Sequence, residues 1–159
     1  AFFEDFSAAF SKLIHLGCEN QPGCPMLPDS AAETFRMAAM HGNLDAVLDA
    51  KDVDVNAVEP WSGRSALHKA AFWNHSHVVK YLVEDCKADG NLQDYKGDTA
   101  LHDAARFGHM ESIKLLKGIT NLRLKNKAGL DSVALAQEMG HHEAVECLLS
   151  KEASRCEVQ

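Results

Sequence analysis

Features that would mark a membrane protein or a nucleic-acid-binding protein are scarce in this sequence. No apolar run approaches the roughly 18 residues that a membrane span requires. Lysine and arginine number only 16 against 23 aspartates and glutamates, so the formal net charge at pH 7 is −7. This deficit of positive charge argues against nucleic acid as a partner, because nucleic acid binds to a basic face. It also gives no reason to expect direct membrane insertion or attraction to an anionic membrane.

Cysteine is too sparse and too scattered for a disulfide framework. The five cysteines form an odd set with irregular spacing: Cys18, Cys24, Cys86, Cys147 and Cys156. This usage predicts a reducing compartment, such as the cytoplasm or the stroma or matrix of an organelle. Cys18 and Cys24 lie close together in the sequence, so whether they form a regulatory disulfide stays open.

What the sequence does contain is a repeated unit of about 33 residues. The clearest copy is Gly97–His109, GDTALHDAARFGH, which is followed by the apolar run MESIKLL. It returns as Gly63–His75 and as Gly129–His141, and in a weaker form as Thr34–Leu48.

Each copy predicts a tight turn followed by two helices. Thr99 is a favourable N-cap, and Leu101, Ala104 and Ala105 recur behind it at helical spacing. Gly108 then suits the end of this helix, and the apolar run after it predicts a second helix. The sequence therefore predicts an all-α fold built from pairs of helices.

This pattern resembles the ankyrin-repeat family. The matching residues are Ala-Leu-His at 66–68 and 100–102, Ala-Ala at 38–39, 70–71 and 104–105, Gly-His at 108–109 and 140–141, and Ala-Asp-Gly-Asn at 88–91. Departures are Ala66 and Ala100, where the family's usual Thr-Pro-Leu-His has proline, and Ala134 in place of the histidine. The resemblance implies a solenoid of about four helix-turn-helix repeats over residues 30–150, with short β-hairpin-like loops and degenerate end copies that cap the stack.

The resemblance accounts for most of the nine histidines. His68 and His102 stand where the family's imidazole bonds the backbone and ties the hairpin to the helix. His75, His109 and His141 occupy the turn between the two helices of a repeat. A metal site is the alternative, but ligands that recur once per repeat would not converge on one ion. We therefore expect neither a metal nor another cofactor.

The sequence also lacks the common catalytic motifs. It contains no G-x-S-x-G, H-E-x-x-H, P-loop or G-x-G-x-x-G. Asp103 follows His102, but Lys69 and Leu135 take its place in the neighbouring copies, which indicates variation within a repeat rather than a catalytic dyad. We therefore expect no enzymatic activity and no small-molecule substrate.

Two regions flank the repeats. Residues 1–17, AFFEDFSAAFSKLIHLG, predict an amphipathic helix, residues 18–29 a linker with prolines and cysteines, and residues 151–159 a polar tail. The first of these resembles the C-terminal helix of class I haem peroxidases of the ascorbate-peroxidase type, in the pattern FF-x-DF-x-x-AF-x-KL-x-x-LG. The resemblance implies ancestry or a missing fusion partner rather than activity, since the peroxidase's haem ligand and distal residues have no counterpart here. A generic amphipathic helix that covers the first repeat is the alternative.

Aromatic and cationic side chains mark the surface that the ankyrin resemblance assigns to partners. In that architecture the two residues after Ala-Ala and the hairpin tips face a concave groove. The residues that we expect to contact a partner there are Trp61, Arg64, Phe72, Trp73, Tyr95, Lys96, Arg106, Phe107 and Met139. Aromatic residues, methionine and arginine are enriched at interfaces. The alternative is that Phe72, Phe107 and Met139 turn inward and pack between adjacent repeats.

These features together predict a non-catalytic scaffold or adaptor that binds a protein partner. The acidic balance favours a partner of basic or mixed charge, through the rate of encounter. Two alternatives stay open. One is an accessory subunit of a larger organellar assembly, for which a plastid would fit the peroxidase resemblance. The other is a C-terminal appendage or relic of such a peroxidase.

Overall fold

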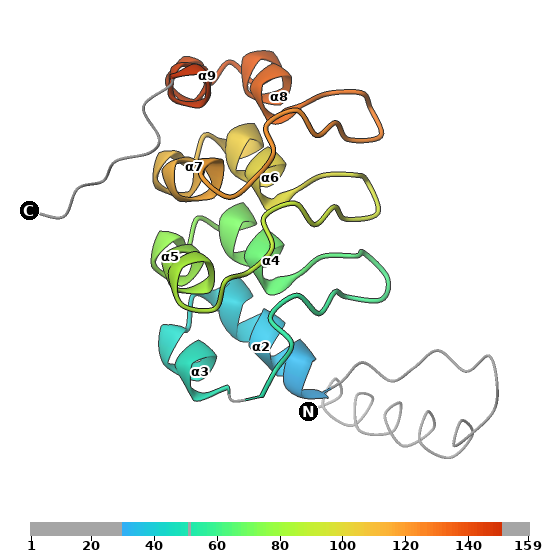
Figure 1. The fold of residues 1–159 in the computed structure, drawn as a ribbon, viewed down its shortest axis with the longest axis vertical. Coiled ribbons are helices and arrows are strands. Elements are labelled where there is room, and N and C mark those ends of the chain that lie inside the picture. The colour runs from blue at the N-terminus through green and yellow to red at the C-terminus, as the bar shows by residue number, and fades with distance from the viewer. Residues whose placement is uncertain (1–29, 51, 151–159) are drawn as a thin grey trace, which may run out of the picture.

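The structure is a computed structural model that describes residues 30–50 and 52–150. Within these residues all regular elements are helices, arranged in four consecutive pairs: α2 (Ser30–His41) with α3 (Leu44–Asp49), α4 (Ala66–Phe72) with α5 (Ser76–Glu84), α6 (Ala100–Phe107) with α7 (Met110–Lys117), and α8 (Ser132–Glu138) with α9 (His142–Leu149). Figure 1 shows the pairs stacked in chain order, with the loops that join them projecting to one side. The predicted all-α stack of about four helix-turn-helix repeats is therefore confirmed for this part of the chain.

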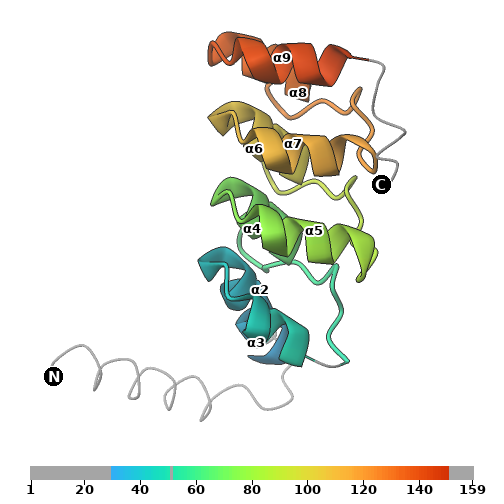
Figure 2. The same ribbon diagram turned by 90° about the vertical axis from the view of Figure 1, so that its left-hand side faces the viewer.

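The helices form two layers. The inner helices α2, α4, α6 and α8 lie next to the projecting loops, and the outer helices α3, α5, α7 and α9 lie on the far side from them (Figures 1 and 2). No helix among the described residues is long and apolar enough to cross a membrane. The predicted segments 1–17, 18–29 and 151–159 lie outside the described residues, so the boundaries of these regions stay predictions.

The helix ends are set by local contacts, and α6 begins after Thr99 and ends at Gly108 as the sequence predicts. Thr99 Oγ1 accepts a hydrogen bond from His102 N at 3.4 Å, and His102 Nδ1 accepts one from Thr99 N at 3.2 Å, which together cap α6. Asp131 caps α8, because its Oδ1 accepts a hydrogen bond from Ala134 N at 2.8 Å. Gly108 ends α6 with a left-handed φ of 67°, a conformation that glycine adopts without a steric cost.

Small residues let the inner helices approach one another closely. Ala70 and Ala71 in α4 and Ala104 and Ala105 in α6 are fully buried. The outer helices add larger apolar side chains to the same core, among them Leu82, Ile113, Leu116 and Leu148. Burying a side chain of this size stabilises the fold by about 1.5–3 kcal/mol, so the interfaces between repeats hold the stack together.

Two histidines, His68 and His102, tie the α4–α5 pair and the α6–α7 pair to the hairpins that follow them. The N–H of Ser65 donates to His68 Nδ1 at 3.3 Å, so the ring proton lies on Nε2, which donates to the Asp98 carbonyl at 3.0 Å. His102 Nε2 contacts the Leu130 carbonyl in the same way, at 3.2 Å. The predicted structural role of these two histidines is confirmed, and their bonds reach the next repeat as well as their own turn.

A second set of histidines bonds each repeat to the one before it. His75, His109 and His141 stand in the turn between the two helices of their repeats. Their Nε2 atoms contact the carbonyl oxygens of Met40, Phe72 and Arg106 at 3.0, 3.1 and 3.0 Å. Because each imidazole bonds the end of the preceding inner helix, these contacts fix the spacing of neighbouring repeats.

Candidate functional site: the concave surface

The hairpin tips are closed by backbone hydrogen bonds at equivalent positions. Asp94 N donates to the Asp98 carbonyl, and Glu59 N donates to the Arg64 carbonyl, each at 2.9 Å. The first hairpin, 59–64, is therefore one residue longer than the second, 94–98, in agreement with the sequence, in which residues 57–63 are one more than the equivalent residues 92–97. The longer loop carries Trp61 at its tip, where 63% of the residue is exposed.

Adjacent hairpins are bonded to one another into a continuous edge. Tyr95 N donates to the Ser62 carbonyl at 2.9 Å, and Lys127 N donates to the Lys96 carbonyl at 2.9 Å. The Tyr95 hydroxyl also donates to the Pro60 carbonyl at 2.7 Å. These bonds hold the Tyr95 ring in place although the residue is exposed, so the edge presents its side chains in a fixed arrangement.

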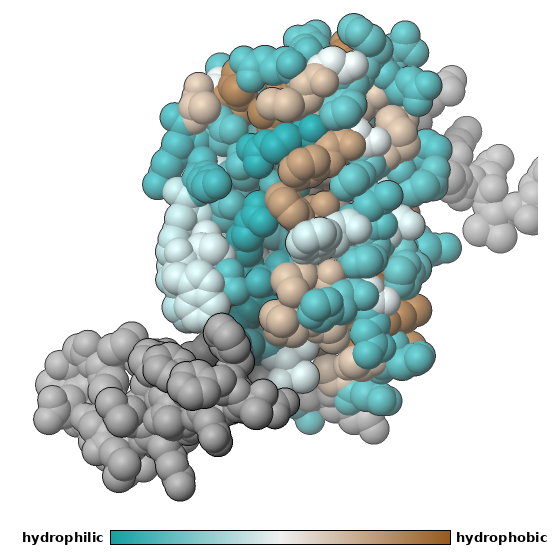
Figure 3. All heavy atoms as spheres, turned by 180° about the vertical axis from the view of Figure 1, so that it is seen from behind, coloured by the Kyte–Doolittle hydropathy of each residue, from teal (hydrophilic) through white to brown (hydrophobic). Residues whose placement is uncertain are grey.

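Most of the predicted contact residues are exposed in the structure. The five with large apolar side chains in the open are Trp61 (63%), Trp73 (56%), Tyr95 (54%), Met139 (49%) and Phe107 (43%). Lys96 is exposed as well, and Phe72 is half-buried. Figure 3 shows hydrophobic side chains gathered across the middle of one face of the stack. Inward packing, the alternative for Phe72, Phe107 and Met139, therefore describes Phe72 best.

Phe72 connects the aromatic residues of neighbouring repeats. Its ring lies edge-on to Trp73, with centroids 5.4 Å apart, and to Phe107, with centroids 4.9 Å apart. The Arg64 guanidinium lies 5.0 Å from the centre of the Phe72 ring, within the range of a cation–π contact. The half-buried Phe72 ring thus packs against both Trp73 and Phe107 and stabilises the positions of these two exposed side chains.

Arg64 and Arg106 are held by buried carboxylates rather than left free. Arg64 bonds Asp94 at 3.2 Å and Asp103 at 2.7 Å. Arg106 bonds Asp98 at 2.6 Å and lies 3.4 Å from Asp103. Only 21% of the Arg64 side chain and 25% of the Arg106 side chain are exposed. Each can offer one edge of its guanidinium to a partner while it compensates charge inside the protein.

The three aspartates of this network differ in their surroundings. Burial raises the pKa of Asp103 to about 7, although the charges of Arg64 and Arg106 act in the opposite direction. Burial also acts to raise the pKa of Asp98, but hydrogen bonds from Asn126 and Arg106 outweigh it and lower that pKa. The network was missed in the sequence, because Arg64 and Asp103 are separated by more than one repeat and no local spacing links them.

The histidines that suggested a metal site are occupied by other contacts. His75 and His77 each bond a backbone carbonyl, that of Met40 at 3.0 Å and that of Gly42 at 2.9 Å. In the part of the chain that the structure describes, no three His, Cys, Asp or Glu residues are grouped so that they could hold a metal ion.

A sequence model of a known family matches this chain, under the description "Ankyrin repeats (3 copies)", over residues 35–126. The match covers more than half of the 159 residues, and the chain therefore belongs to the ankyrin-repeat family. Ankyrin repeats generally mediate protein–protein interaction.

Two mammalian proteins are similar to part of the chain. It is 34% identical over 105 residues to the liver isoform of mitochondrial glutaminase from Mus musculus, which covers 66% of this chain and 15% of that protein. It is 38% identical over 84 residues to the corresponding protein from Rattus norvegicus, which covers 50% of this chain and 14% of the relative. The matched part thus spans about one seventh of the length of these relatives.

Neither comparison supports the resemblance of residues 1–17 to haem peroxidases or the plastid setting that it suggested. The segment lies outside the described residues and outside residues 35–126, which the family match covers. The peroxidase resemblance stays a prediction.

Proposed function

We propose that this chain is a non-catalytic scaffold or adaptor that binds a protein partner across the concave surface. The observation that carries the proposal is the set of five exposed apolar side chains on the hairpin tips and at the ends of the inner helices: Trp61, Trp73, Tyr95, Phe107 and Met139. Exposed apolar groups gathered on one face are typical of interaction sites, and tryptophan and tyrosine are the residues that most often dominate binding energy.

The rigidity of the surface supports the same proposal. Tyr95 is fixed by two hydrogen bonds to the neighbouring hairpin, and Trp73 rests against Phe72. Because these side chains are already ordered, binding would cost little conformational entropy. We propose a partner that offers apolar groups to this surface. The net charge of −7 favours a partner of basic or mixed charge through the rate of encounter.

The similarity to glutaminases bears on whether the chain is an enzyme. The relatives are named for an enzymatic activity, but the matched part makes up only 15% and 14% of their length. We propose that the shared ankyrin-repeat region contributes binding and no catalysis. An alternative is that the module is an appendage or accessory subunit of a larger assembly, and the much greater length of these relatives, both named as mitochondrial, favours it.

The test is a substitution that places a charge on the concave surface and leaves the hydrophobic core unchanged. Since Trp73 is 56% exposed, we expect Trp73→Glu to abolish partner binding while the thermal midpoint stays within a few degrees of wild type. The matched control is Leu48→Glu, which adds the same charge at an exposed apolar residue on the outer helix α3.

Affinity capture from the native source, read by quantitative mass spectrometry, compares the three proteins. A partner captured by wild type and Leu48→Glu but not by Trp73→Glu supports the proposal. Capture that Trp73→Glu leaves unchanged, or a large loss of stability in that variant, would show that Trp73 is not a contact residue.

A further inference from the structure

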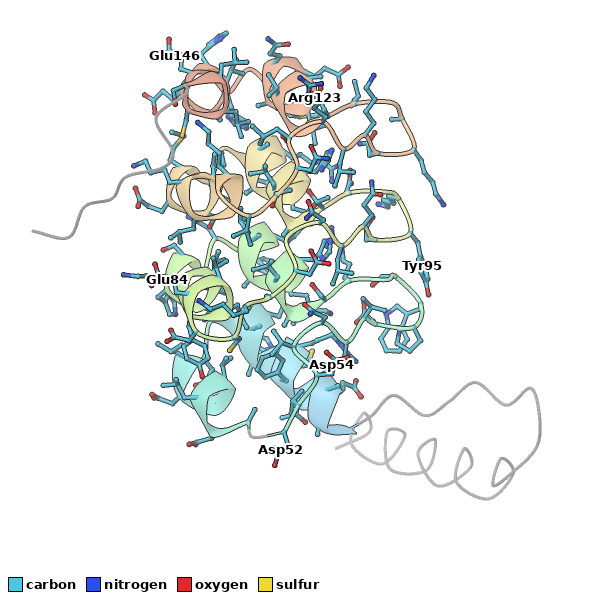
Figure 4. All side chains as sticks on the ribbon, viewed as in Figure 1. Asp52, Asp54, Glu84, Tyr95, Arg123 and Glu146 are labelled. Carbon is cyan, nitrogen blue, oxygen red and sulfur yellow. The ribbon has the colours of Figure 1, made fainter. Side chains whose placement is uncertain are left out.

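The segments that connect successive repeats carry charges of opposite sign at the two ends of the stack. Asp52 and Asp54 are exposed on the first connecting segment, and Asp89 is exposed on the second. The third, residues 118–131, differs because it contains three cations and a single acidic residue, the half-buried Asp131 that caps α8, in a chain whose net charge is −7. Figure 4 shows Asp52 and Asp54 near the foot of the stack and Arg123 near its top.

The third segment turns its cations outward in a regular alternation. Arg123, Lys125 and Lys127 are exposed, whereas the residues between them, Leu122, Leu124 and Asn126, are half-buried. Leu122 packs against the core, and Asn126 Nδ2 donates to Asp98 at 2.9 Å. The half-buried residues therefore anchor the segment and leave the cationic side chains in solvent.

A fourth cation joins these three at the neighbouring hairpin tip. Lys127 N donates to the Lys96 carbonyl at 2.9 Å, which places the exposed Lys96 beside Lys127. Gln93 Nε2 donates to the Lys125 carbonyl at 3.0 Å and to the Gly97 carbonyl at 2.7 Å, so the two segments are held together. We name Lys96, Arg123, Lys125 and Lys127 the basic strip.

Within residues 30–50 and 52–150, no acidic side chain compensates the charge of the basic strip. No side chain of the strip makes an ion pair or hydrogen bond with the described residues, unlike Arg64, Arg106 and Lys69, which each bond a carboxylate. The nearby Asp94 and Asp98 are buried and already paired with arginines. Four clustered cations that no described residue pairs with, on a chain whose net charge is −7, can attract an anionic group.

We propose that the basic strip binds a short acidic segment of a partner protein. Three of its four cations lie within residues 123–127, which span at most about 14 Å even in a fully extended chain. Beyond the strip, the connecting segments carry Asp89, Asp54 and Asp52. A nucleic acid or an anionic membrane extends past the strip and meets this repulsion, whereas an acidic peptide of a few residues avoids it. The opposite charges at the two ends would also fix the direction in which the segment lies.

The basic strip differs from the concave surface in its chemistry, and Lys96 is the one residue that belongs to both the strip and the contact residues predicted for that surface. The basic strip includes none of the exposed apolar residues Trp61, Trp73, Tyr95, Phe107 and Met139. Binding at the strip therefore does not depend on the function proposed above, and Trp73→Glu should leave it unchanged.

The experiment measures binding of a fluorescently labelled peptide of alternating glutamate and serine to the full chain, by anisotropy. We expect saturable, salt-sensitive binding that Lys125→Glu weakens about fivefold or more, through loss of one attraction and gain of one repulsion. The matched control is Lys80→Glu, which makes the same change of charge at an exposed lysine of α5 outside the strip. We expect the control to weaken binding less than about twofold, as a long-range and screened effect.

Competing probes distinguish the other anionic ligands. Single-stranded DNA and phosphatidylserine vesicles are titrated against wild type and Lys125→Glu under the same conditions, and sedimentation equilibrium tests for self-association. Tighter binding of DNA or vesicles than of the peptide, with dependence on Lys125, would overturn the choice of an acidic protein segment. Dimers that Lys125→Glu dissociates would instead identify a second copy of this chain as the occupant. Equal effects of the two lysine variants, or no peptide binding, would overturn the proposal as a whole.

Discussion

At the scale of single residues, the buried Asp103 depends on the two arginines that flank it. Arg64 bonds its carboxylate at 2.7 Å and Arg106 lies at 3.4 Å, and Asp103 itself has no exposed surface. Removing one arginine leaves a buried charge with too little compensation, which is costlier than losing an exposed ion pair. We expect Arg64→Ala to lower the free energy of unfolding by about 2–4 kcal/mol, measured by urea denaturation.

The control for Arg64→Ala is the same substitution in an Asp103→Asn background. If the cost arises from the uncompensated carboxylate, we expect at least about half of it to disappear there, since residues in direct contact are not additive. An equal cost in both backgrounds would show that Arg64 stabilises the fold mainly through its other contacts, the ion pair with Asp94 and the Phe72 ring.

Asp103 also leads us to expect a dependence of stability on pH. Burial raises the pKa of Asp103 from an ordinary value of 3.8 to about 7 in the folded chain, so the folded chain holds the proton more tightly than the unfolded chain. The stability that this group contributes is present below about pH 4 and is lost as the pH rises through about 7. We expect the free energy of unfolding of wild type, relative to Asp103→Asn, to decline between about pH 4 and about pH 7.

The comparison with Asp103→Asn is needed because two buried histidines change the stability of the fold with pH in the opposite direction. Burial lowers the pKa of His68 and of His102, so their contribution is present above about pH 6.5 and is lost as the pH falls. Both proteins share this effect, and it cancels in their difference. A difference that stays flat across the same pH range would contradict the raised pKa of Asp103.

At the scale of elements, two hairpin glycines have the same left-handed backbone conformation but differ in how closely other atoms surround them. Gly63 and Gly129 both have left-handed φ angles, of 72° and 80°. A Cβ atom at Gly63 would lie 2.6 Å from Tyr95 Cδ1, whereas one at Gly129 would meet no atom within 4 Å. We expect Gly129→Ala to cost about 1–2 kcal/mol from backbone strain alone, and Gly63→Ala about 1–3 kcal/mol more, because the Tyr95 ring must move.

Thermal or urea unfolding of the two glycine variants, made as a pair, measures this difference. The Tyr95 hydroxyl would lose its hydrogen bond to the Pro60 carbonyl if the ring swung aside, so the clash at Gly63 is not relieved freely. Equal costs for the two substitutions would mean that Tyr95 moves without resistance and that the hairpin edge is less rigid than its hydrogen bonds indicate.

The helices could be predicted from the sequence because their signals are local. Thr99, Asp131 and Gly108 bond or turn within one or two turns of their own helices, and the alanine pairs mark the buried face directly. The longer first hairpin could also be predicted, by counting residues between copies. In each case the physical cause lies within a few residues of the pattern that indicates it.

The details of the site could not be predicted, because they depend on contacts between repeats. Phe72 and Arg106 occupy equivalent positions in their repeats, yet Phe72 packs against Phe107 and Trp73 while Arg106 pairs with Asp98. Arg64 was expected to face a partner, and the structure shows it bonded to a carboxylate of the next repeat. The side chains of the neighbouring repeats determine the surroundings of each residue. A periodic sequence pattern does not distinguish equivalent positions whose surroundings differ.

At the scale of the whole molecule, the stack presents two kinds of surface on one rigid frame. The hairpin tips and the ends of the inner helices carry exposed aromatic groups, and the basic strip carries cations on a chain whose net charge is −7. Figures 3 and 4 view the stack from opposite directions, the first showing the hydrophobic side chains and the second labelling Arg123. Because the repeats hold both surfaces in fixed positions, one partner could contact them together or two partners could bind in turn.

The measurement that tests the central claim most directly is hydroxyl-radical footprinting of the chain with and without its captured partner. Oxidation of Trp61, Trp73 and Tyr95 is read residue by residue by mass spectrometry, with the exposed Leu48 of α3 as an internal reference. We predict strong protection of the three aromatic residues in the complex and unchanged oxidation of Leu48. Unchanged oxidation of Trp61 and Trp73, with protection on the outer helices instead, would contradict binding across the concave surface.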